Sequence, residues 1–331
     1  MLKKLNIAVV GATGMVGRKM LEVLAERKVP VGELIPFASA RSAGSKLNWQ
    51  GYDYTVVELT EKNIISRQID YALFSAGGGI SRDFAPVFAR HGSVVIDNSS
   101  HWRMDSSVPL VVPEVNAYDL TWHKNIIANP NCSTIQAVVA LAPLHKKFGI
   151  KRIIYSTYQA VSGAGVAGHT DLENGVKGMP PQKFSHPIFG NLIPQIDTFL
   201  PSGYTKEEQK MIDETRKILN DKNMRITATT VRVPVYNGHS ESINVEFEKP
   251  ATLDAIKKCL ADADGVILMD DPNSGVYPTP LHVSGKDEVF VGRLRIDDSI
   301  ESGVNLWVVA DNIRKGAATN AVQILEKLIA L

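Results

Sequence analysis

The stretch LNIAVVGATGMVG, residues 5–17, decides the fold of the first half of the chain. Leu5–Val10 has the composition of a short buried strand, and a helical pattern follows the last glycine. Three glycines stand at a spacing of three: Gly11, Gly14 and Gly17. The usual G-x-G-x-x-G fingerprint is not met, because Ala12 stands where its first glycine would fall. A glycine loop between a strand and a helix N-terminus still favours a dinucleotide site over tight packing alone.

The end of the next predicted strand bears on which nucleotide is bound. That strand, Glu33–Ala38, leads into Ser39-Ala40-Arg41-Ser42. A site for NAD would place an acidic residue here to bind the ribose 2′-hydroxyl. Arg41 flanked by the hydroxyls of Ser39 and Ser42 suits a 2′-phosphate instead, although a solvated loop arginine is the alternative. The residues favour NADP over NAD.

Strands and helices continue to alternate up to about residue 148. A helix is predicted to end near Arg90, and further strands are predicted at Asp70–Ser75, Ser93–Asp97, Leu110–Pro113 and Asn125–Ala128. This alternation is typical of an α/β fold with a doubly wound parallel sheet, whose ligands bind at the carboxyl ends of the strands.

The second half of the chain has a different pattern of predicted elements, with longer strands and fewer helices. Lys151–Ala160 alternates like a strand, and a Gly/Pro-rich stretch with few regular signals runs to about Pro201. Tyr204–Asn220 predicts an amphipathic helix capped by Thr205. Longer strands are predicted at Arg225–Val235, Glu241–Glu248, Glu288–Ile296 and Val304–Ala310, and a last helix at Asn312–Leu331. These elements predict a second, α+β domain with an antiparallel or mixed sheet.

Cys132 stands in the run Asn129-Pro130-Asn131-Cys132-Ser133-Thr134. The run joins a predicted strand to a predicted helix, so Cys132 is expected at the helix N-terminus. There the dipole favours an anion, and the thiol should ionise more readily. Cys132 is therefore a candidate nucleophile, and the alternative is a small buried residue. Cys259, in the helical pattern Leu253–Ala261, has no motif around it and is interpreted as structural.

Bulk composition narrows the class of protein. A chain of 331 residues exceeds one typical compact core, so two domains are expected. The 36 Lys and Arg against 35 Asp and Glu suggest neither a nucleic-acid nor an anionic-membrane partner. Two cysteines without a Cys/His cluster suggest neither a disulfide framework nor a metal site. The start, Met1-Leu2-Lys3-Lys4, has no usual signal peptide, and no window spans a bilayer, so we expect a cytoplasmic protein.

Four motifs in order resemble the bacterial type of aspartate-β-semialdehyde dehydrogenase. They are Gly11-Ala12-Thr13-Gly14, the run around Cys132, Tyr158–Gly165 (YQAVSGAG) and Arg232–His239 (RVPVYNGH). The resemblance implies a Rossmann-like NADP domain of residues 1–131, completed by the C-terminal helix 313–331. It also implies a catalytic and dimerisation domain of residues 132–312 and a homodimer.

The resemblance also implies the reaction and its residues. Cys132 would attack the acyl phosphate of L-aspartyl-4-phosphate, and NADPH would reduce the thioester to L-aspartate 4-semialdehyde, a step toward lysine, methionine and threonine. His239 would be the general acid and base, taking a proton from the thiol and protonating the thiohemiacetal oxygen. Gln159 would orient the acyl intermediate. Without the family, a lone histidine after a glycine is more often a surface or capping residue.

Substrate and cofactor contacts are implied in the same way. Arg232 would pair with the α-carboxylate. Glu207 would hold the α-ammonium, with neighbouring Glu208 as the alternative, and Arg103 and Lys210 would bind phosphate. His101 departs from the pattern, as either a spectator or an extra titratable group. For the cofactor the resemblance implies pyrophosphate contacts at Gly11, Thr13, Gly14, Met15 and Val16, 2′-phosphate contacts at Ser39, Arg41 and Ser42, and contacts near the nicotinamide at Ser162, Gly163 and Asn312.

Two other functions remain open at this point. N-acetyl-γ-glutamyl-phosphate reductase performs the same chemistry on a longer, acetylated substrate, and an acid able to hold a free ammonium argues against it. A non-catalytic NADP-binding paralogue is the alternative from a different class. Joint retention of Cys132, Gln159, Arg232 and His239 argues against that reading.

Overall fold

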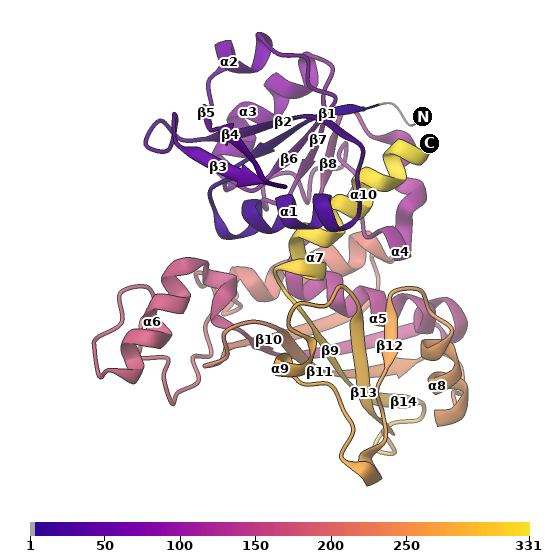
Figure 1. Ribbon diagram of the computed structural model, residues 1–331. Helices are drawn as coiled ribbons and strands as arrows, with labels where there is room; N and C mark the ends of the chain where they lie inside the picture. Colours follow the sequence, from indigo (N-terminus) through magenta and orange to yellow (C-terminus); the bar gives the residue numbers. More distant parts are fainter. Residues whose placement is uncertain (1–3) are drawn as a thin grey trace. The chain divides into compact units, whose positions relative to one another are not determined.

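The computed structural model describes residues 4–331, which form two compact units (Figure 1). The first unit holds the chain up to Pro130 together with Ala317–Leu331, and the second holds Asn131–Gly316. The sequence predicted domain boundaries between residues 131 and 132 and between residues 312 and 313. The prediction that the chain has no signal peptide rests partly on residues 1–3, which lie outside the described residues.

The first unit is built on a six-stranded parallel sheet of order β5-β2-β1-β6-β7-β8. Its strands are β1 (Leu5–Val10), β2 (Val31–Ala38), β5 (Val57–Glu58), β6 (Tyr71–Phe74), β7 (Val94–Asp97) and β8 (Ile126–Ala128). The central strands are almost fully buried, as expected when helices cover both faces of a parallel sheet. The predicted doubly wound parallel sheet is confirmed.

Helices α1 (Met15–Glu26), α3 (Gly78–Arg90) and α10 (Thr319–Ala330) pack against the strands of this sheet. Two shorter helices adjoin them: α2 (Glu61–Ile65) contacts α3, and α4 (Pro113–Asn116) contacts α10. The C-terminal α10 packs against α1, α4 and β7, and its apolar side chains belong to the same buried cluster as those of β1. A small antiparallel hairpin, β3 (Lys46–Trp49) with β4 (Tyr52–Thr55), is a further part that the sequence did not predict.

The strand predicted at Leu110–Pro113 is wrong. Only Leu110 makes an isolated bridge, to Ala128, and Pro113 begins α4. Backbone hydrogen bonds hold the start of the run to β8, from Val111 N–H to the Ala128 carbonyl and from Ala128 N–H to the Pro109 carbonyl. The Asn116 side chain then accepts the N–H of Val112 and donates to the carbonyl of Leu110. One amide side chain thus replaces part of the backbone pairing of a strand, which periodicity could not predict.

The second unit contains a six-stranded mixed sheet of order β10-β9-β11-β14-β13-β12. Its strands are β9 (Ile150–Gln159), β10 (Arg225–Arg232), β11 (His239–Phe247), β12 (Val266–Leu268), β13 (Val289–Ile296) and β14 (Gly303–Ala310). The pairs β9–β10 and β12–β13 are parallel, and the others are antiparallel. The predicted mixed sheet is confirmed.

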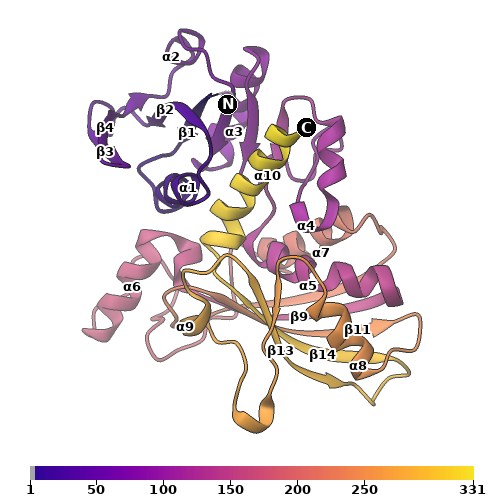
Figure 2. The same ribbon diagram turned by 45° about the vertical axis from the view of Figure 1, so that its right-hand side comes forward.

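Three helices pack on the second sheet: α5 (Cys132–Phe148), α7 (Lys206–Ile218) and α8 (Leu253–Ala261) (Figures 1 and 2). Helix α5 contacts four of the strands and both other helices, and its sequence is apolar on nearly every side, as a buried helix requires. Thr205 caps α7 in a full capping box, as predicted. The short α9 (Pro280–Val283) precedes β13.

The Gly/Pro-rich stretch before Pro201 is more ordered than predicted, because it contains α6 (Val166–Val176). The helix is hard to recognise because it contains Gly168, where a Cβ would lie 2.2 Å from the carbonyl oxygen of Val161. Asp171 then holds the following loop by accepting three backbone N–H groups, from residues 182–184. This contact lowers the pKa of the carboxyl, since the hydrogen bonds outweigh burial, which raises it.

The last predicted helix, Asn312–Leu331, begins later than expected. A π-helical turn occupies Arg314–Ala318, and α10 starts at Thr319. One carboxylate oxygen of Asp311 accepts the N–H groups of Ile313 and Arg314, which holds the chain in a turn before the helix. The change from one compact unit to the other falls within this turn.

Candidate active site

Cys132 is the first residue of α5, with Asn131 as the extended residue before it. Its half-buried side chain lies beside Gly316, where a Cβ would stand 2.7 Å from the Cβ of Cys132. The thiol donates to Oδ1 of Asn131 over 3.9 Å. The sulfur therefore lies at the helix N-terminus, as the sequence predicts, where unpaired N–H groups favour an anion.

Cys259 has a different setting, on α8. Its thiol donates to the carbonyl oxygen of Pro143 over 3.4 Å, which ties α8 to α5. Burial raises the pKa of this thiol. A thiol held in its neutral form between two helices agrees with the structural interpretation.

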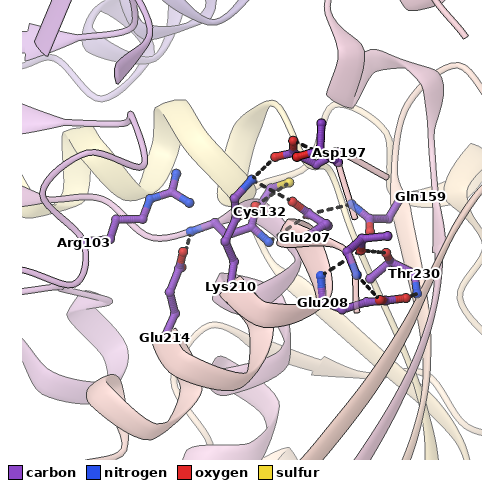
Figure 3. A network of polar contacts seen from close by, with 12 residues as sticks. Arg103, Cys132, Gln159, Asp197, Glu207, Glu208, Lys210, Glu214 and Thr230 are labelled. Atoms are coloured by element: carbon purple, nitrogen blue, oxygen red, sulfur yellow. Dashed lines mark hydrogen bonds and ion pairs between the residues drawn. The ribbon is translucent and has the colours of Figure 1, made fainter. Parts of the chain in front are cut away.

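Glu207, in the first turn of α7, is the centre of a buried polar network (Figure 3). One carboxylate oxygen accepts from Nδ2 of Asn131 at 3.0 Å and from Nε2 of Gln159 at 3.1 Å. The other accepts from Nζ of Lys210 at 3.2 Å, and the same ammonium pairs with Asp197 at 3.0 Å. Burial raises the pKa of Glu207, but the Lys210 charge and these hydrogen bonds outweigh it, so the net pKa is lowered.

Glu208 has a structural task instead. One of its oxygens accepts the N–H of Thr205 at 2.6 Å, completing the capping box, and the other accepts the N–H of Thr230 at 3.0 Å. Both oxygens are therefore engaged by backbone and tie α7 to β10. Of the two neighbouring glutamates, Glu207 is the one that faces the candidate site.

A cavity of about 550 Å³ lies beside this network. Charged side chains of both signs line it, together with loop residues of the stretch before α7: Lys183, Asp197, Glu207, Lys210 and Arg232. Gly163 forms part of the wall, and a Cβ there would stand 2.7 Å from a terminal nitrogen of Arg232. The glycine leaves the guanidinium accessible to the cavity.

Arg232 ends β10 and is almost completely buried. Its backbone forms a two-way bridge with Ile193, and its NH1 group donates to the carbonyl oxygen of Ala160 at 2.7 Å. The ring of Phe184 lies 5.8 Å from the guanidinium carbon. Burial lowers the pKa of the guanidinium, and negative charge on Glu207 or on an ionised Cys132 opposes that effect. This is a fixed cation in a partly apolar setting, suited to a carboxylate ligand.

His239 begins β11 and is fully buried. Its Nδ1 accepts the backbone N–H of Ala160 at 3.0 Å, whereas Nε2 has no hydrogen-bond partner within residues 4–331. Burial lowers its pKa well below the ordinary value, and the Arg232 charge lowers it further. The imidazole is therefore neutral at physiological pH.

The predicted residues Ser162, Gly163 and Asn312 also meet in the second unit. The Asn312 amide exchanges hydrogen bonds with the hydroxyl of Ser162, at 2.9 and 3.1 Å. Its oxygen also accepts the N–H of Gly238 at 2.9 Å, which holds the turn immediately before His239. Contact of these three residues with a nicotinamide stays a prediction.

The glycine loop of the first unit has the geometry that a pyrophosphate needs. Gly11 has φ +84°, and a Cβ there would lie 2.4 Å from the Ser75 carbonyl oxygen. Gly17 lets α1 approach the loop, since a Cβ would lie 2.2 Å from the Gly11 oxygen. A cavity of about 300 Å³ opens here, lined by residues that include Gly11, Thr13, Gly14 and Ser39. Met15 and Val16 lie in the first turn of α1, and this turn contains no acidic residue.

Arg41 and Ser42 follow in the turn after β2. The N–H of Ser42 donates to the Ser39 carbonyl at 2.9 Å, and Arg41 is exposed. An exposed arginine two residues after Ser39, which lines the cavity, fits a 2′-phosphate, and within residues 4–331 no carboxylate lines the cavity to bind a free ribose hydroxyl. The residues therefore fit NADP.

Arg103 is buried in the first unit. Its guanidinium donates to the carbonyl oxygens of Asn129 at 3.0 Å and Asn98 at 2.9 Å. His101, two residues earlier, packs its ring edge-on against Trp102 at 4.7 Å. The Trp102 indole N–H donates to the hydroxyl of Ser81 at 3.0 Å. Phosphate binding by Arg103 stays a prediction.

Three polar residues of the second unit were missed from the sequence: Asn131, Asp197 and Glu241. Asn131 belongs to the cysteine motif, so its place beside the thiol could have been noticed. Asp197 lies in the Gly/Pro-rich stretch and reaches the network only through Lys210. Glu241, two residues after His239 on β11, is fully buried and carries no motif signal. Within residues 4–331 no cluster of His, Cys, Asp or Glu is arranged to hold a metal.

A glycine-loop nucleotide unit and a unit with a cysteine at a helix N-terminus are the parts of a dehydrogenase that works through a thioester. Family models agree: a semialdehyde dehydrogenase NAD-binding domain matches residues 6–123, and a semialdehyde dehydrogenase dimerisation domain matches residues 141–315.

Full-length relatives narrow the class. The chain is 56% identical to the aspartate-semialdehyde dehydrogenase of Aquifex aeolicus over 98% of both chains, and 46% identical to that of Bacillus subtilis over 98% and 97%. The crystal structure of aspartate semialdehyde dehydrogenase II from Vibrio cholerae superposes with a TM-score of 0.95, at 49% identity over 99% of both chains. The chain belongs to the aspartate-semialdehyde dehydrogenase family. Among residues 4–331, no helix has the length and apolar character to cross a membrane.

Proposed function

We propose that this chain is an NADP-dependent aspartate-semialdehyde dehydrogenase, which reductively dephosphorylates L-aspartyl-4-phosphate to L-aspartate 4-semialdehyde in lysine, methionine and threonine synthesis. Family membership supports the reaction class. A Vibrio cholerae relative has been solved as a complex with ASA, and one from Candida albicans with NADP. The observation that carries the substrate assignment is that Arg232 and Glu207 line the same cavity.

A cation and an anion in one cavity match the two charged groups of a free amino acid. Arg232 can hold the α-carboxylate with two parallel hydrogen bonds, and Glu207, ionised by its lowered pKa, can hold the α-ammonium. An N-acetylated substrate has no ammonium, so it would form no ion pair with Glu207, whose carboxylate would keep Lys210 as its cationic partner. Lys210, in the wall of the same cavity, supplies positive charge for the phosphoryl group, and we propose the same task for Arg103 of the first unit. The charges of the cavity therefore favour aspartyl phosphate over the longer acetylated acyl phosphate.

The catalytic sequence begins at Cys132. Its thiolate attacks the acyl carbon, the carbonyl oxygen takes negative charge, and phosphate leaves to give a thioester. NADPH, when bound, supplies the hydride that reduces this thioester. Gln159, fixed between Thr157 and Glu207, can orient the acyl group without adding a charge beside the thiolate. Collapse of the adduct then releases the aldehyde and restores the thiolate.

We also propose a cytoplasmic homodimer formed through the second unit. The family model for residues 141–315 is described as a dimerisation domain. A groove of about 340 Å³ lies over the sheet of this unit, lined by residues that include Tyr277, Pro278 and Trp307. Tyr158 packs against Trp307 at 5.5 Å and is itself exposed, so aromatic surface is present for a second copy to cover. Two free cysteines fit a reducing compartment.

The test is an assay in the oxidative direction. Purified protein is mixed with L-aspartate semialdehyde, phosphate and NADP, and NADPH absorbance is followed beside the Cys132→Ala variant. We expect phosphate-dependent reduction of NADP that the variant lacks. Folded protein that binds NADPH but gives no signal would refute the aspartyl assignment, and N-acetyl-γ-glutamyl semialdehyde would then be the next substrate. A Cys132→Ala variant that kept full biological activity would indicate a non-catalytic paralogue.

A further inference from the structure

The Arg232 side chain leaves one edge of its guanidinium for a ligand. Its NH1 group donates to the carbonyl oxygen of Ala160 at 2.7 Å, whereas Nε is buried and has no hydrogen-bond partner within residues 4–331. In a guanidinium the Nε–H and one N–H of NH2 point the same way, so together they can hold a carboxylate by two parallel hydrogen bonds. A buried donor without a partner costs free energy, so a bound group is expected at this edge.

An aromatic ring lies against the same guanidinium. The Arg232 guanidinium carbon lies over the Phe184 ring, 5.8 Å from its centroid. The cation is attracted to the negative face of the ring, and this attraction is stronger where water is excluded, as at the almost completely buried Arg232. The ring also fills the space on its side, so the guanidinium cannot turn that way. Phe184 packs in turn against a buried apolar cluster: Val161, Leu172, Ile188 and Ile193.

Asp171 of α6 fixes the backbone of Phe184. One carboxylate oxygen accepts the N–H of Phe184 at 2.9 Å and that of Lys183 at 2.8 Å, and the other accepts the N–H of Gln182 at 2.9 Å. Residues 182–184 belong to no helix or strand, so these bonds replace the regular pairing that would otherwise hold their backbone. Hydrogen bonds to an ionised carboxylate are about twice as strong as neutral ones. Asp171 therefore determines the position from which the Phe184 ring extends.

Phe184 and Arg232 both line the cavity of about 550 Å³. Asp171 is only 3% exposed and uses both oxygens on backbone N–H groups, so it affects a ligand through the loop that it holds. The backbone of Arg232 exchanges two hydrogen bonds with Ile193, which belongs to the apolar cluster beneath Phe184. The ring and the backbone of the arginine are thus held by the same cluster, which leaves only the arginine side chain to be oriented.

The orientation of this side chain matters because Glu207 lines the same cavity. The negative charge of Glu207 acts on the Arg232 guanidinium, yet within residues 4–331 the two form no ion pair. A direct salt bridge between them would neutralise both charges that a zwitterionic amino acid needs. The Ala160 carbonyl and the Phe184 ring restrain the guanidinium, so they keep its free edge available to a ligand.

We propose that Phe184 and Asp171 are positioning residues for substrate binding. Phe184 orients the Arg232 guanidinium so that its Nε and NH2 edge meets the α-carboxylate of the amino-acid substrate, and Asp171 fixes Phe184 through the loop backbone. The inference rests on the proposed function, because it takes the α-carboxylate as the ligand of Arg232. Neither residue contacts the reacting atoms in this scheme, so both act on the affinity for the amino acid and leave the chemical step unchanged.

Steady-state kinetics in the oxidative direction provide the first test. Leucine at position 184 keeps an apolar side chain and removes the ring, and asparagine at position 171 removes the charge that holds the loop. We expect Phe184→Leu and Asp171→Asn to raise KM for L-aspartate semialdehyde about 3–30-fold, the size of a partly desolvated cation–π contact. The value of kcat and the KM values for NADP and phosphate should not change, since only ground-state binding of the amino acid is lost.

The matched control is Phe189→Leu, an exposed ring of the same stretch, which should leave every constant unchanged. Should Asp171→Asn fail to fold, Phe184→Leu decides the matter, because it keeps the three hydrogen bonds of the loop. An unchanged KM for the semialdehyde in Phe184→Leu, or a fall in kcat without a rise in KM, would overturn the proposal.

The second test reads the arginine directly and needs no turnover. Protein carrying ¹⁵N-arginine is examined through its Nε–Hε correlations, with Arg232→Lys used to assign the signal. Aromatic ring currents shift nearby protons, so the Arg232 signal should move in Phe184→Leu and in Asp171→Asn but not in Phe189→Leu. L-Aspartate, which has both α-groups and no aldehyde, is then titrated; we expect the signal to move again, with a weaker affinity in Phe184→Leu. An Arg232 signal unmoved in Phe184→Leu would overturn the proposal.

The two tests also separate this proposal from the proposed function. Inactivity toward L-aspartate semialdehyde, together with weaker L-aspartate binding in Phe184→Leu, would reject the proposed reaction while the positioning role would stand. Full activity with the same KM in the parent and in Phe184→Leu would reject the positioning role and leave the proposed function intact.

Discussion

The stability that Glu241→Gln gains over the parent protein should increase as the pH rises. The side chain lies on β11 and is fully buried; within residues 4–331 neither carboxyl oxygen has a partner at full hydrogen-bond geometry, although the nearby Gln136 amide favours the charged form. Burial raises its pKa well above the ordinary value, and the nearby charge of Glu207 raises it further. The folded protein therefore holds this proton to a higher pH than the unfolded chain, which releases it near pH 4.5.

The sign and size of the effect follow from linkage. Between pH 4.5 and the folded pKa, the folded state binds one proton more than the unfolded state, so the free energy of unfolding falls as the pH rises. The slope is about 1.4 kcal/mol per pH unit. Glutamine has a similar shape and no titration, so Glu241→Gln lacks this slope. Relative to the parent, the variant should gain stability as the pH rises from 5 to 7, by at most about 2.5 kcal/mol.

Urea denaturation at pH 5, 6 and 7, followed by circular dichroism, measures the difference between the two proteins. The matched control is Glu246→Gln on the same strand, whose carboxylate pairs with Lys151 at 2.7 Å. The Lys151 hydrogen bond lowers the pKa of Glu246, so this group is ionised in both states over that range, and its difference should stay flat. A flat difference for Glu241→Gln as well would refute the buried, protonated carboxyl.

Four further results are expected. Gly17→Ala should cost at least about 1–3 kcal/mol of stability and weaken NADPH binding, measured by urea denaturation and fluorescence titration, whereas Gly79→Ala, with nothing within 4 Å of its Cβ, should be near neutral. Arg41→Glu should weaken NADPH binding far more than NADH binding; equal losses in titrations would contradict the 2′-phosphate assignment. Thr205→Ala should lower the free energy of unfolding by about 1–2 kcal/mol, because its buried hydroxyl caps α7. Cys132→Ser should nearly abolish turnover in the NADP assay while retaining the fold, since an alcohol ionises far less readily than a thiol.

Local patterns in the sequence were sufficient for most of the elements. The strand predicted at Leu5–Val10 matches β1, and the helix capped by Thr205 has its predicted capping box. Such features depend on hydrogen bonds and side-chain periodicity within a few residues, so the sequence contains them directly. The same holds for the place of Cys132 at the start of α5, because a turn and an apolar helix flank it.

The failures occur where distant residues decide the outcome. Leu110–Pro113 was predicted as a strand, but the amide of Asn116 replaces part of the backbone pairing that a strand would need. Helix α6 was missed because Gly168 weakens its pattern, although the glycine is needed for close contact with Val161. Periodicity carries no information about such contacts, since one side chain or one missing Cβ supplies them.

By itself, the sequence determined the two kinds of domain, the glycine loop and a cysteine at a helix N-terminus, all of which depend on neighbours in the chain. Only the tertiary structure decided that Glu207 faces the cavity while Glu208 is bound by backbone, because the N–H of Thr230 reaches Glu208 from β10. It also decided that Nδ1 of His239 accepts the backbone N–H of Ala160, a residue 79 positions away. Hydrogen bonds between separate strands assign a titratable side chain its role, and they exist only once the chain has folded.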